Sequence, residues 1–376
     1  MFKVILAVLL PVLLVLAVGL SGAPPAVMTG EAEAQPPLEA EVLADGLVRP
    51  WGIAVLPDGT VLFTERGGAL KRIPPGGEAV EVAVLADTAV GGEGGLLGLA
   101  LDAEFASNRY LYLARNLNAG APEVRVSRFV LSEAFELLDE VAIVSGIPAN
   151  PSGRHSGTQL AMSADGVLWI GTGDAANGAA PQDPASLGGK ILRVDRDGNG
   201  VAGNLGAPFD PRIFSYGHRN TQGLVLLPEP RDGVYGYSAE HGSWIEDEVN
   251  PLVPGNFGWA PGLPYDEDVP MTDLARFPDA VAAAWQSGDR TIAVSGLAIL
   301  RGEAWGALDG RLVVGVLKDQ HIRLPDLSGE GRDILWFEGE FGRIRAVQLG
   351  PDDALYVGTD NGTDDKIVRV RPNGGD

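Results

Sequence analysis

The stretch Ala54-Val-Leu-Pro-Asp-Gly-Thr-Val-Leu-Phe-Thr64 has the pattern of a β-hairpin. Apolar residues lead into a Pro-Asp-Gly sequence, and a second strand-like run follows at once. Proline and glycine adopt the backbone angles that a tight reversal requires, so this composition marks a turn between two strands. The stretch therefore predicts two antiparallel strands joined by a short turn.

Five later stretches share this pattern, which makes the hairpin a repeated unit. They are residues 100–105 with 109–113, 161–171, 225–228 with 232–237, 296–300 with 309–315, and 348–358. Six units at irregular spacings of roughly 40 to 75 residues are typical of blades set around an axis. The fold class that we expect is an all-β, six-bladed β-propeller of four-stranded antiparallel blades.

Polar strand-like segments follow several hairpins and are expected to complete their blades. Examples are residues 69–73, 190–194 and 366–370. Residues 38–43 are expected to close the last blade, because an open ring would leave two sheet edges unpaired. The only helical pattern is at 273–285, between the fourth and fifth units. No domain boundary is evident within 35–376, which we interpret as a single catalytic domain.

Composition narrows the class of protein. The chain has 376 residues, of which 45% are hydrophobic and 21% charged, so it can bury a large core. Its 28 Lys and Arg against 50 Asp and Glu give a net charge of −22, which argues against nucleic-acid partners and against docking on an anionic membrane. The absence of cysteine excludes disulfides, thiolate metal sites and a cysteine nucleophile.

Residues 1–34 have the features of an export signal with a short linker. A basic start at Lys3 precedes an apolar run from Val4 to Leu20, and an Ala-x-Ala pattern follows at Ala32 and Ala34. The alternative is an N-terminal membrane anchor, since 17 apolar residues approach spanning length. Pro11 and the small residues favour a cleaved signal, whose removal would leave no stable membrane span. Both interpretations export the rest of the chain, and the expected location is periplasmic or secreted.

Candidate chemistry lies between the hairpins, where propeller loops converge on the axis. All four histidines (His155, His218, His241 and His321) fall in these connections. A histidine among small neighbours, such as His155, can act as a proton acceptor near neutral pH. Arg219 and Asn220 stand side by side at a strand end, and Arg219 is suited to stabilising a developing oxyanion.

Further cations come from separate units of this acidic chain. Lys318 follows an apolar strand, and Arg343 and Arg345 are two residues apart, which on an extended segment directs both to one side. Their convergence predicts an anionic ligand near the axis, because arginine pairs match carboxylates or phosphates. The acidic stretch 240–250, with glycine and asparagine, suits a hard cation, and calcium is favoured over magnesium.

In this order, the segments resemble the soluble quinoprotein glucose dehydrogenase and aldose sugar dehydrogenase family. The resemblance runs from Pro50-Trp51-Gly52 to the C-terminus. One motif alone is weak, but the ordered set is specific. The motifs are Gly94-Gly-Leu-Leu-Gly-Leu-Ala100, His155-Ser-Gly157, Gln182-Asp183, Leu187-Gly-Gly-Lys-Ile-Leu-Arg193, Tyr216-Gly-His-Arg-Asn220, Glu240-His-Gly242, Asp247-Glu-Val-Asn250, Gly255-Asn-Phe-Gly-Trp259, Val294-Ser-Gly-Leu297, Leu317-Lys318 and Gly342-Arg-Ile-Arg345.

The resemblance implies a six-bladed propeller that uses pyrroloquinoline quinone (PQQ) and calcium to oxidise the C1 hydroxyl of aldoses to lactones. It makes His155 the general base while hydride passes to the quinone C5, and Arg219 the group that polarises the quinone carbonyl. The other implied cofactor-binding positions are Glu93, Gln182, Asn220, Tyr265, Lys318, Arg343 and Arg345, the last three for the PQQ carboxylates. Implied metal positions are Gly242 and Ser243 through main-chain oxygens, and Glu248 with the Phe257 region for a structural calcium.

Some positions depart from the family pattern. Glu93 stands where relatives usually have glutamine, Ser243 replaces a proline, Phe257 replaces a tyrosine, and Arg154 replaces an acid of the glucose enzyme. The expected partners are an aldose and an external electron acceptor, and the expected assembly is a monomer or homodimer. Two other functions are compatible with the fold: a calcium-dependent sugar lactonase, and a non-catalytic propeller that binds carbohydrate or protein.

Overall fold

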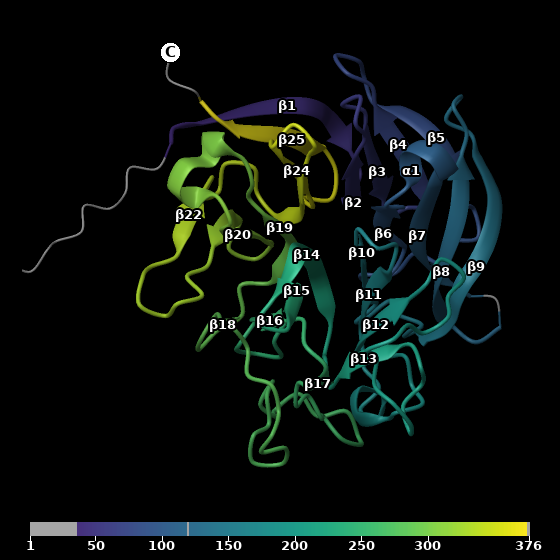
Figure 1. The fold of residues 1–376 in the computed structure, drawn as a ribbon, viewed down its shortest axis with the longest axis vertical. Helices are drawn as coiled ribbons and strands as arrows, with labels where there is room; N and C mark the ends of the chain where they lie inside the picture. The colour runs from purple at the N-terminus through teal and green to yellow at the C-terminus, as the bar shows by residue number, and fades with distance from the viewer. Residues whose placement is uncertain (1–35, 119, 374–376) are drawn as a thin grey trace, which may run out of the picture. The chain divides into compact units, whose positions relative to one another are not determined.

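The computed structural model describes residues 36–118 and 120–373. The predicted signal peptide and linker at 1–34 lie outside these residues. Within the described part, six sheets are arranged around an axis (Figure 1). No helix in the described part is long and apolar enough to cross a membrane.

The first three blades follow one another along the chain. Blade one contains β2 (Pro50–Val55), β3 (Val61–Glu65), β4 (Ala69–Ile73) and β5 (Val80–Val84). Blade two contains β6 (Leu96–Leu101), β7 (Tyr110–Leu117), β8 (Glu123–Leu131) and β9 (Leu137–Pro148). Blade three contains β10 (Gly157–Met162), β11 (Leu168–Thr172), β12 (Lys190–Val194) and β13 (Ile213–Tyr216), extended by the parallel strand β17 (Gly255–Asn256).

The other three blades complete the ring. Blade four contains β14 (Thr221–Arg231), β15 (Val234–Glu240), β16 (Glu248–Pro251) and β18 (Trp285–Gln286). Blade five contains β19 (Val294–Ile299), β20 (Leu312–Val316), β21 (His321–Leu324) and β22 (Ile334–Trp336). Blade six contains β23 (Ile344–Leu349), β24 (Leu355–Thr359), β25 (Asp365–Pro372) and β1 (Leu38–Leu47). The described helices are short: α1 (Phe105–Asn108) and two 3-10 turns at Ala180–Gln182 and Glu303–Leu308.

This architecture confirms the predicted all-β propeller of four-stranded antiparallel blades. Each of the six predicted hairpins forms the two innermost strands of a blade. The predicted closing strand is also confirmed, because β1 pairs antiparallel with β25 from Leu38 opposite Pro372 to Leu47 opposite Asp365. In Figure 1 these strands, one from each end of the described chain, lie side by side.

The core is divided among the interfaces between neighbouring blades. Each of the six interfaces has its own cluster of buried apolar side chains. The innermost strands β2, β6, β10, β14, β19 and β23 contact one another in a closed circle. Glycines permit this approach near the axis: a Cβ at Gly52 would lie 2.8 Å from the main-chain nitrogen of Leu99, and one at Gly223 would lie 2.2 Å from the Ser295 oxygen.

Two predictions of local structure were wrong. Residues 273–285 form turns instead of a helix, since Pro278 has no N–H and the N–H groups of Val281 and Ala284 donate to the carbonyls of Asn256 and Val249, both at 2.8 Å. The segments at 69–73, 190–194 and 366–370 are third strands, not the last strands of their blades. The strands beyond them are β5 in blade one, β13 and β17 in blade three, and the predicted closing strand β1 in blade six.

His321 is also misplaced by the sequence interpretation, because it begins the third strand of blade five instead of joining the axial loops. Its Nδ1 lies 3.1 Å from the Asp319 carbonyl, and its Nε2 accepts a hydrogen bond from Arg323 at 3.3 Å. Burial, followed by the positive charge of Arg323, lowers the pKa of His321 to about 4. The folded protein therefore holds this imidazole neutral.

This neutral imidazole predicts a specific loss of stability in acid. The unfolded chain takes up a proton at His321 near its ordinary pKa of 6.5, whereas the folded chain does so only near 4. The contribution of the neutral His321 to the free energy of unfolding is therefore complete above pH 6.5 and is lost as the pH falls towards 4. Thermal unfolding of wild type and His321→Gln should therefore diverge in this window, with the wild type falling more steeply. Parallel curves would contradict the assignment.

Candidate active site

The polar residues of interest lie at one end of the ring, where innermost strands begin and second strands end. His155 precedes β10, and Arg219 and Asn220 precede β14. Asp174 follows β11, and Glu240 is the last residue of β15. In an antiparallel hairpin the start of the first strand lies beside the end of the second. The hairpin repeat itself therefore brings these side chains to a common edge.

His155 is buried and held by a carboxylate. Its Nδ1 lies 2.8 Å from Oδ1 of Asp174, which is fully buried, and 3.2 Å from the hydroxyl of Tyr265. The other carboxylate oxygen of Asp174 accepts hydrogen bonds of 2.8 Å from the Tyr265 hydroxyl and from the Trp259 indole. This arrangement fixes the ring and leaves Nε2 as the nitrogen available for proton transfer.

Asp174 was missed by the sequence interpretation. The available signal was its position directly after the buried strand Leu168–Thr172, in Gly173-Asp174, at the same end of the blade as His155. A carboxylate at this point can orient the imidazole and stabilise its protonated form. The sequence alone did not reveal this pairing because 19 residues separate the two side chains.

Arg219 is buried in a polar environment. Its NH1 donates to the carbonyl of His241 at 3.0 Å, and its NH2 donates to the carboxylate of Glu267, which also accepts a hydrogen bond from Arg154. The main-chain N–H of Arg219 donates to Glu240 at 2.7 Å. Burial acts to raise the pKa of Glu240, but the adjacent His218 and the hydrogen bonds that it accepts hold that pKa below its ordinary value.

A continuous series of hydrogen bonds crosses the site; we call Glu93, Asn220, Gln222, Arg345 and Asp360 the central network. Asn220 donates to Glu93 at 2.9 Å, and Gln222 donates to the same oxygen at 3.4 Å. Arg345 donates to Gln222 at 2.6 Å and to Asp360 at 3.1 Å. Burial acts to raise the pKa of Glu93, but His241, His155, Asn220 and Arg345 together keep it lowered.

The remaining predicted cations differ in exposure. Arg345 is buried, with its guanidinium 3.9 Å from the centre of the Trp51 ring. Arg343 is half-buried and donates to the main-chain oxygen of Asp360 at 3.0 Å, so both arginines contact Asp360. Lys318 is exposed, and its ammonium lies 3.3 Å from the Thr291 hydroxyl.

Several buried polar atoms of this site have no hydrogen-bond partner within the described part of the chain. They are Arg219 Nε, Asn220 Oδ1, His241 Nε2 and Arg345 Nε. Unsatisfied buried donors and acceptors are rare in proteins and indicate a missing ligand, ion or water. Three of the four are nitrogens, two of them on guanidinium groups, which fits a polar ligand that carries negative charge.

The other predicted positions lie in supporting contacts. The Gln182 amide exchanges hydrogen bonds of 3.0 and 3.1 Å with the amide of Asn256 and does not contact the central network. The N–H of Gly242, beside Ser243, donates to buried Asp247 at 2.8 Å. Phe257 stacks on His218 with ring centres 4.4 Å apart.

Glu248 is the predicted metal position with a perturbed carboxyl group. It accepts hydrogen bonds from Asn250, Thr272 and Gln286 at 3.1 to 3.2 Å. Burial, followed by the charge of Glu240, raises its pKa to about 8. No group of three or more histidine, aspartate or glutamate side chains suitable for a metal ion occurs in residues 36–118 and 120–373.

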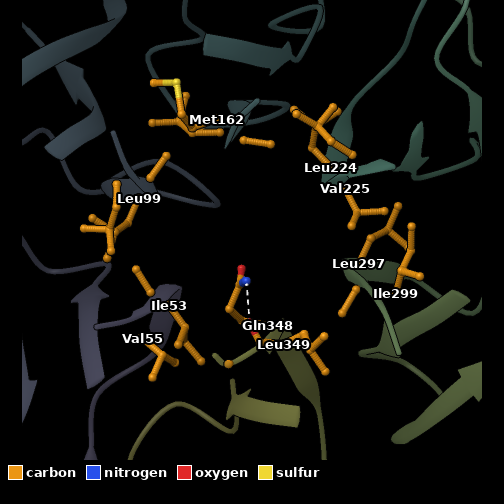
Figure 2. Close-up of a pocket in the computed structure, with 18 of the residues that line it drawn as sticks. Ile53, Val55, Leu99, Met162, Leu224, Val225, Leu297, Ile299, Gln348 and Leu349 are labelled. Carbon is orange, nitrogen blue, oxygen red and sulfur yellow. Dashed lines mark hydrogen bonds between the residues drawn. The ribbon is translucent and has the colours of Figure 1, made fainter. Parts of the chain in front are cut away.

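A separate cavity of about 520 Å³ lies at the opposite end of the axis (Figure 2). Its wall consists mainly of apolar side chains from the innermost strands, including Ile53, Leu99, Leu224 and Leu297, while Gln348 points into it. This cavity holds none of the titratable groups described above. The candidate active site is therefore the end of the axis that holds the titratable side chains, not the end that holds this cavity.

Comparisons with known proteins identify the family of the chain. The chain is 34% identical to uncharacterized protein slr1608 of Synechocystis sp., over 87% of this chain and 85% of that one. It is 30% identical to aldose sugar dehydrogenase YliI of Escherichia coli, over 89% and 93%. The PQQ-bound structure of the aldose sugar dehydrogenase from Streptomyces coelicolor matches with a TM-score of 0.73 and 30% identity, over 89% of this chain and 99% of that one. The glucose/sorbosone dehydrogenase family model matches residues 47–369, and the chain therefore belongs to the glucose/sorbosone dehydrogenase family.

Proposed function

We propose that this protein is an exported, PQQ- and calcium-dependent aldose sugar dehydrogenase, which oxidises the C1 hydroxyl to a lactone and passes electrons to an external acceptor. The observation that carries the proposal is the buried His155–Asp174 pair at the same end of the ring as Arg219, Asn220 and Arg345, whose side chains retain unpaired polar atoms. Export rests on the sequence of residues 1–34 alone.

The residues fit PQQ as the anionic ligand. The unpaired Nε atoms of Arg219 and Arg345 and the Oδ1 of Asn220 offer two donors and one acceptor in a buried position. Exposed Lys318 and half-buried Arg343 add positive charge at the ends of neighbouring blades. Arg343, Arg345 and Lys318 would hold the carboxylates of PQQ, and Asn220, Tyr265 and Gln182 would border or support it. Glu93, the unusual carboxylate, is hydrogen-bonded to Asn220 and Gln222.

Proton transfer belongs to His155. Its Nε2 would accept the proton of the sugar C1 hydroxyl, while the Asp174 carboxylate at Nδ1 stabilises the resulting imidazolium. Bound PQQ would accept the hydride that leaves C1. Arg219 places a buried positive charge where negative charge develops on the acceptor oxygen. Loss of the C1 hydride and the hydroxyl proton converts the aldose to its lactone.

The acid-base pair yields a first test by mutation. We expect His155→Ala to lower sugar-dependent dye reduction by about 10²- to 10⁴-fold, because general-base catalysis contributes this much. Asp174→Asn should also lower it, by up to about 10⁴-fold, because the amide favours the wrong imidazole tautomer and cannot stabilise the imidazolium. PQQ binding, measured by titration of the apoprotein, should persist in both. His321→Gln, a buried histidine outside the site, is the matched control, and full activity in His155→Ala would refute the assignment of the base.

Calcium binding leads to a separate prediction about the thermal stability of the protein. In the proposal the main-chain oxygens of Gly242 and Ser243 bind one ion, while Glu248 and the main chain near Phe257 bind another. Calcium at about 100 times its dissociation constant should stabilise the folded state by about 2.7 kcal/mol. Chelation should lower the thermal midpoint of the wild type and of the control Glu246→Gln. Glu248→Gln should respond less; an unchanged wild-type midpoint would exclude stabilising calcium.

A further inference from the structure

Residues 261–272, a short segment between β17 and β18, contact both the His155–Asp174 pair and Arg219. The Tyr265 hydroxyl donates to Asp174 at 2.8 Å and lies 3.2 Å from Nδ1 of His155. Two residues further on, Glu267 accepts hydrogen bonds from Arg219 and Arg154. The segment therefore contacts the His155–Asp174 pair through Tyr265 and contacts Arg219 through Glu267.

Glu267 lies between two guanidinium groups. Its Oε1 pairs with Arg219 NH2 and its Oε2 with Arg154 NH2. The Glu267 side chain is 17% exposed, compared with 6% for Arg219 and 46% for Arg154. Arg154 thus closes the outer side of the carboxylate, and Arg219 lies on its buried side. Arg154 is also stacked over the Tyr265 ring at 5.5 Å, which ties the outer cation to the same segment.

Glu267 is the one carboxylate that pairs with the Arg219 side chain in the part of the chain that the structure describes. The Arg219 side chain also donates to the carbonyl of His241 and lies 5.5 Å from the centre of the Trp259 ring, and its buried Nε has no hydrogen-bond partner in that part. A buried guanidinium needs a charged partner to keep one orientation, since arginine has many rotamers and desolvation is costly. Glu267 supplies that partner through NH2 of Arg219.

We propose that Glu267 is a positioning residue for Arg219, and that Arg154 holds Glu267 in place from outside. This inference rests on the proposed function, in which Arg219 supplies charge at the reacting oxygen. It also assigns a role to Arg154, which stands next to His155 where the glucose enzyme has an acid. Arg154 and Arg219 each bind one oxygen of the Glu267 carboxylate and so hold it between them. The expected signature is a loss of turnover without a loss of cofactor binding.

The test compares Glu267→Gln with Asp268→Asn, a matched change at an exposed carboxylate of the same segment. Glu267→Gln keeps the shape of the side chain but removes its charge. We expect kcat for aldose-dependent dye reduction to fall about 10- to 100-fold, the usual effect of losing a charged hydrogen bond, with a smaller change in KM. PQQ affinity of the apoprotein should be maintained, because the neighbouring cations keep their charge. Asp268→Asn should match the wild type.

Two readouts separate positioning from a general structural role. In an Arg219→Met background, Glu267→Gln should cause little further loss of kcat, since the residue through which it acts is gone. In the full-length apoprotein, phenylglyoxal should modify Arg219 faster in Glu267→Gln than in Asp268→Asn, as measured by mass spectrometry. Equal loss of kcat in both backgrounds, equal Arg219 labelling in the two variants, or a joint fall of PQQ affinity and thermal stability would overturn the proposal.

The labelling experiment also keeps this inference distinct from the proposed function. It needs neither PQQ nor sugar, so it reports on the Glu267–Arg219 contact even in a protein without dehydrogenase activity. If the wild type neither binds PQQ nor oxidises aldoses, the proposed function fails, and the role of Glu267 in that reaction fails with it. If the wild type is active but labelling is the same in both variants, only the positioning role is overturned.

Discussion

Antiparallel pairing of β1 with β25 is the constraint on which the rest of the structure depends. It joins the two ends of the described chain within one blade and leaves the six innermost strands in a closed circle. Because the polar side chains of the site come from several blades, no blade contains the site by itself. The site exists only because closure of the ring holds the ends of the blades together. Six separate apolar interfaces fix the position of each blade against its neighbours.

The chain as a whole is negatively charged, but buried positive charges lie at this end of the ring. The chain carries a net charge of −22, yet Arg219 and Arg345 are buried near the axis. Each has a carboxylate partner, Glu267 or Asp360, and each keeps an unpaired Nε. Such partners hold the cations in place without saturating their donors. This is the arrangement that an anionic cofactor requires: pre-oriented charge that remains available to a ligand.

The sequence predicted the repeating parts of the molecule better than the connections between them. Hairpins with Pro, Asp and Gly turns can be recognised from local sequence, so the two inner strands of each blade and the closing strand were predicted correctly. Asp174 and Glu267 were missed because their roles depend on partners, His155 and Arg219, that are distant in the sequence. The expected helix at 273–285 failed for a related reason: N–H groups of this segment bond to Asn256 in blade three and to Val249 in blade four, contacts that local propensity does not reveal. His321 seemed similar to the other histidines until the strand order placed it in the outer part of blade five.

In the proposed function, buried cations from separate blades converge with His155 on one site for a tricarboxylate cofactor. Equilibrium titration of the full-length apoprotein with PQQ, in wild type and in Arg345→Gln, tests it most directly. We expect saturable binding of one PQQ per chain and clearly weaker binding in Arg345→Gln, because this change removes the buried guanidinium charge and leaves a polar side chain. Absence of saturable binding in the wild type, or equal affinity in the two proteins, would contradict it.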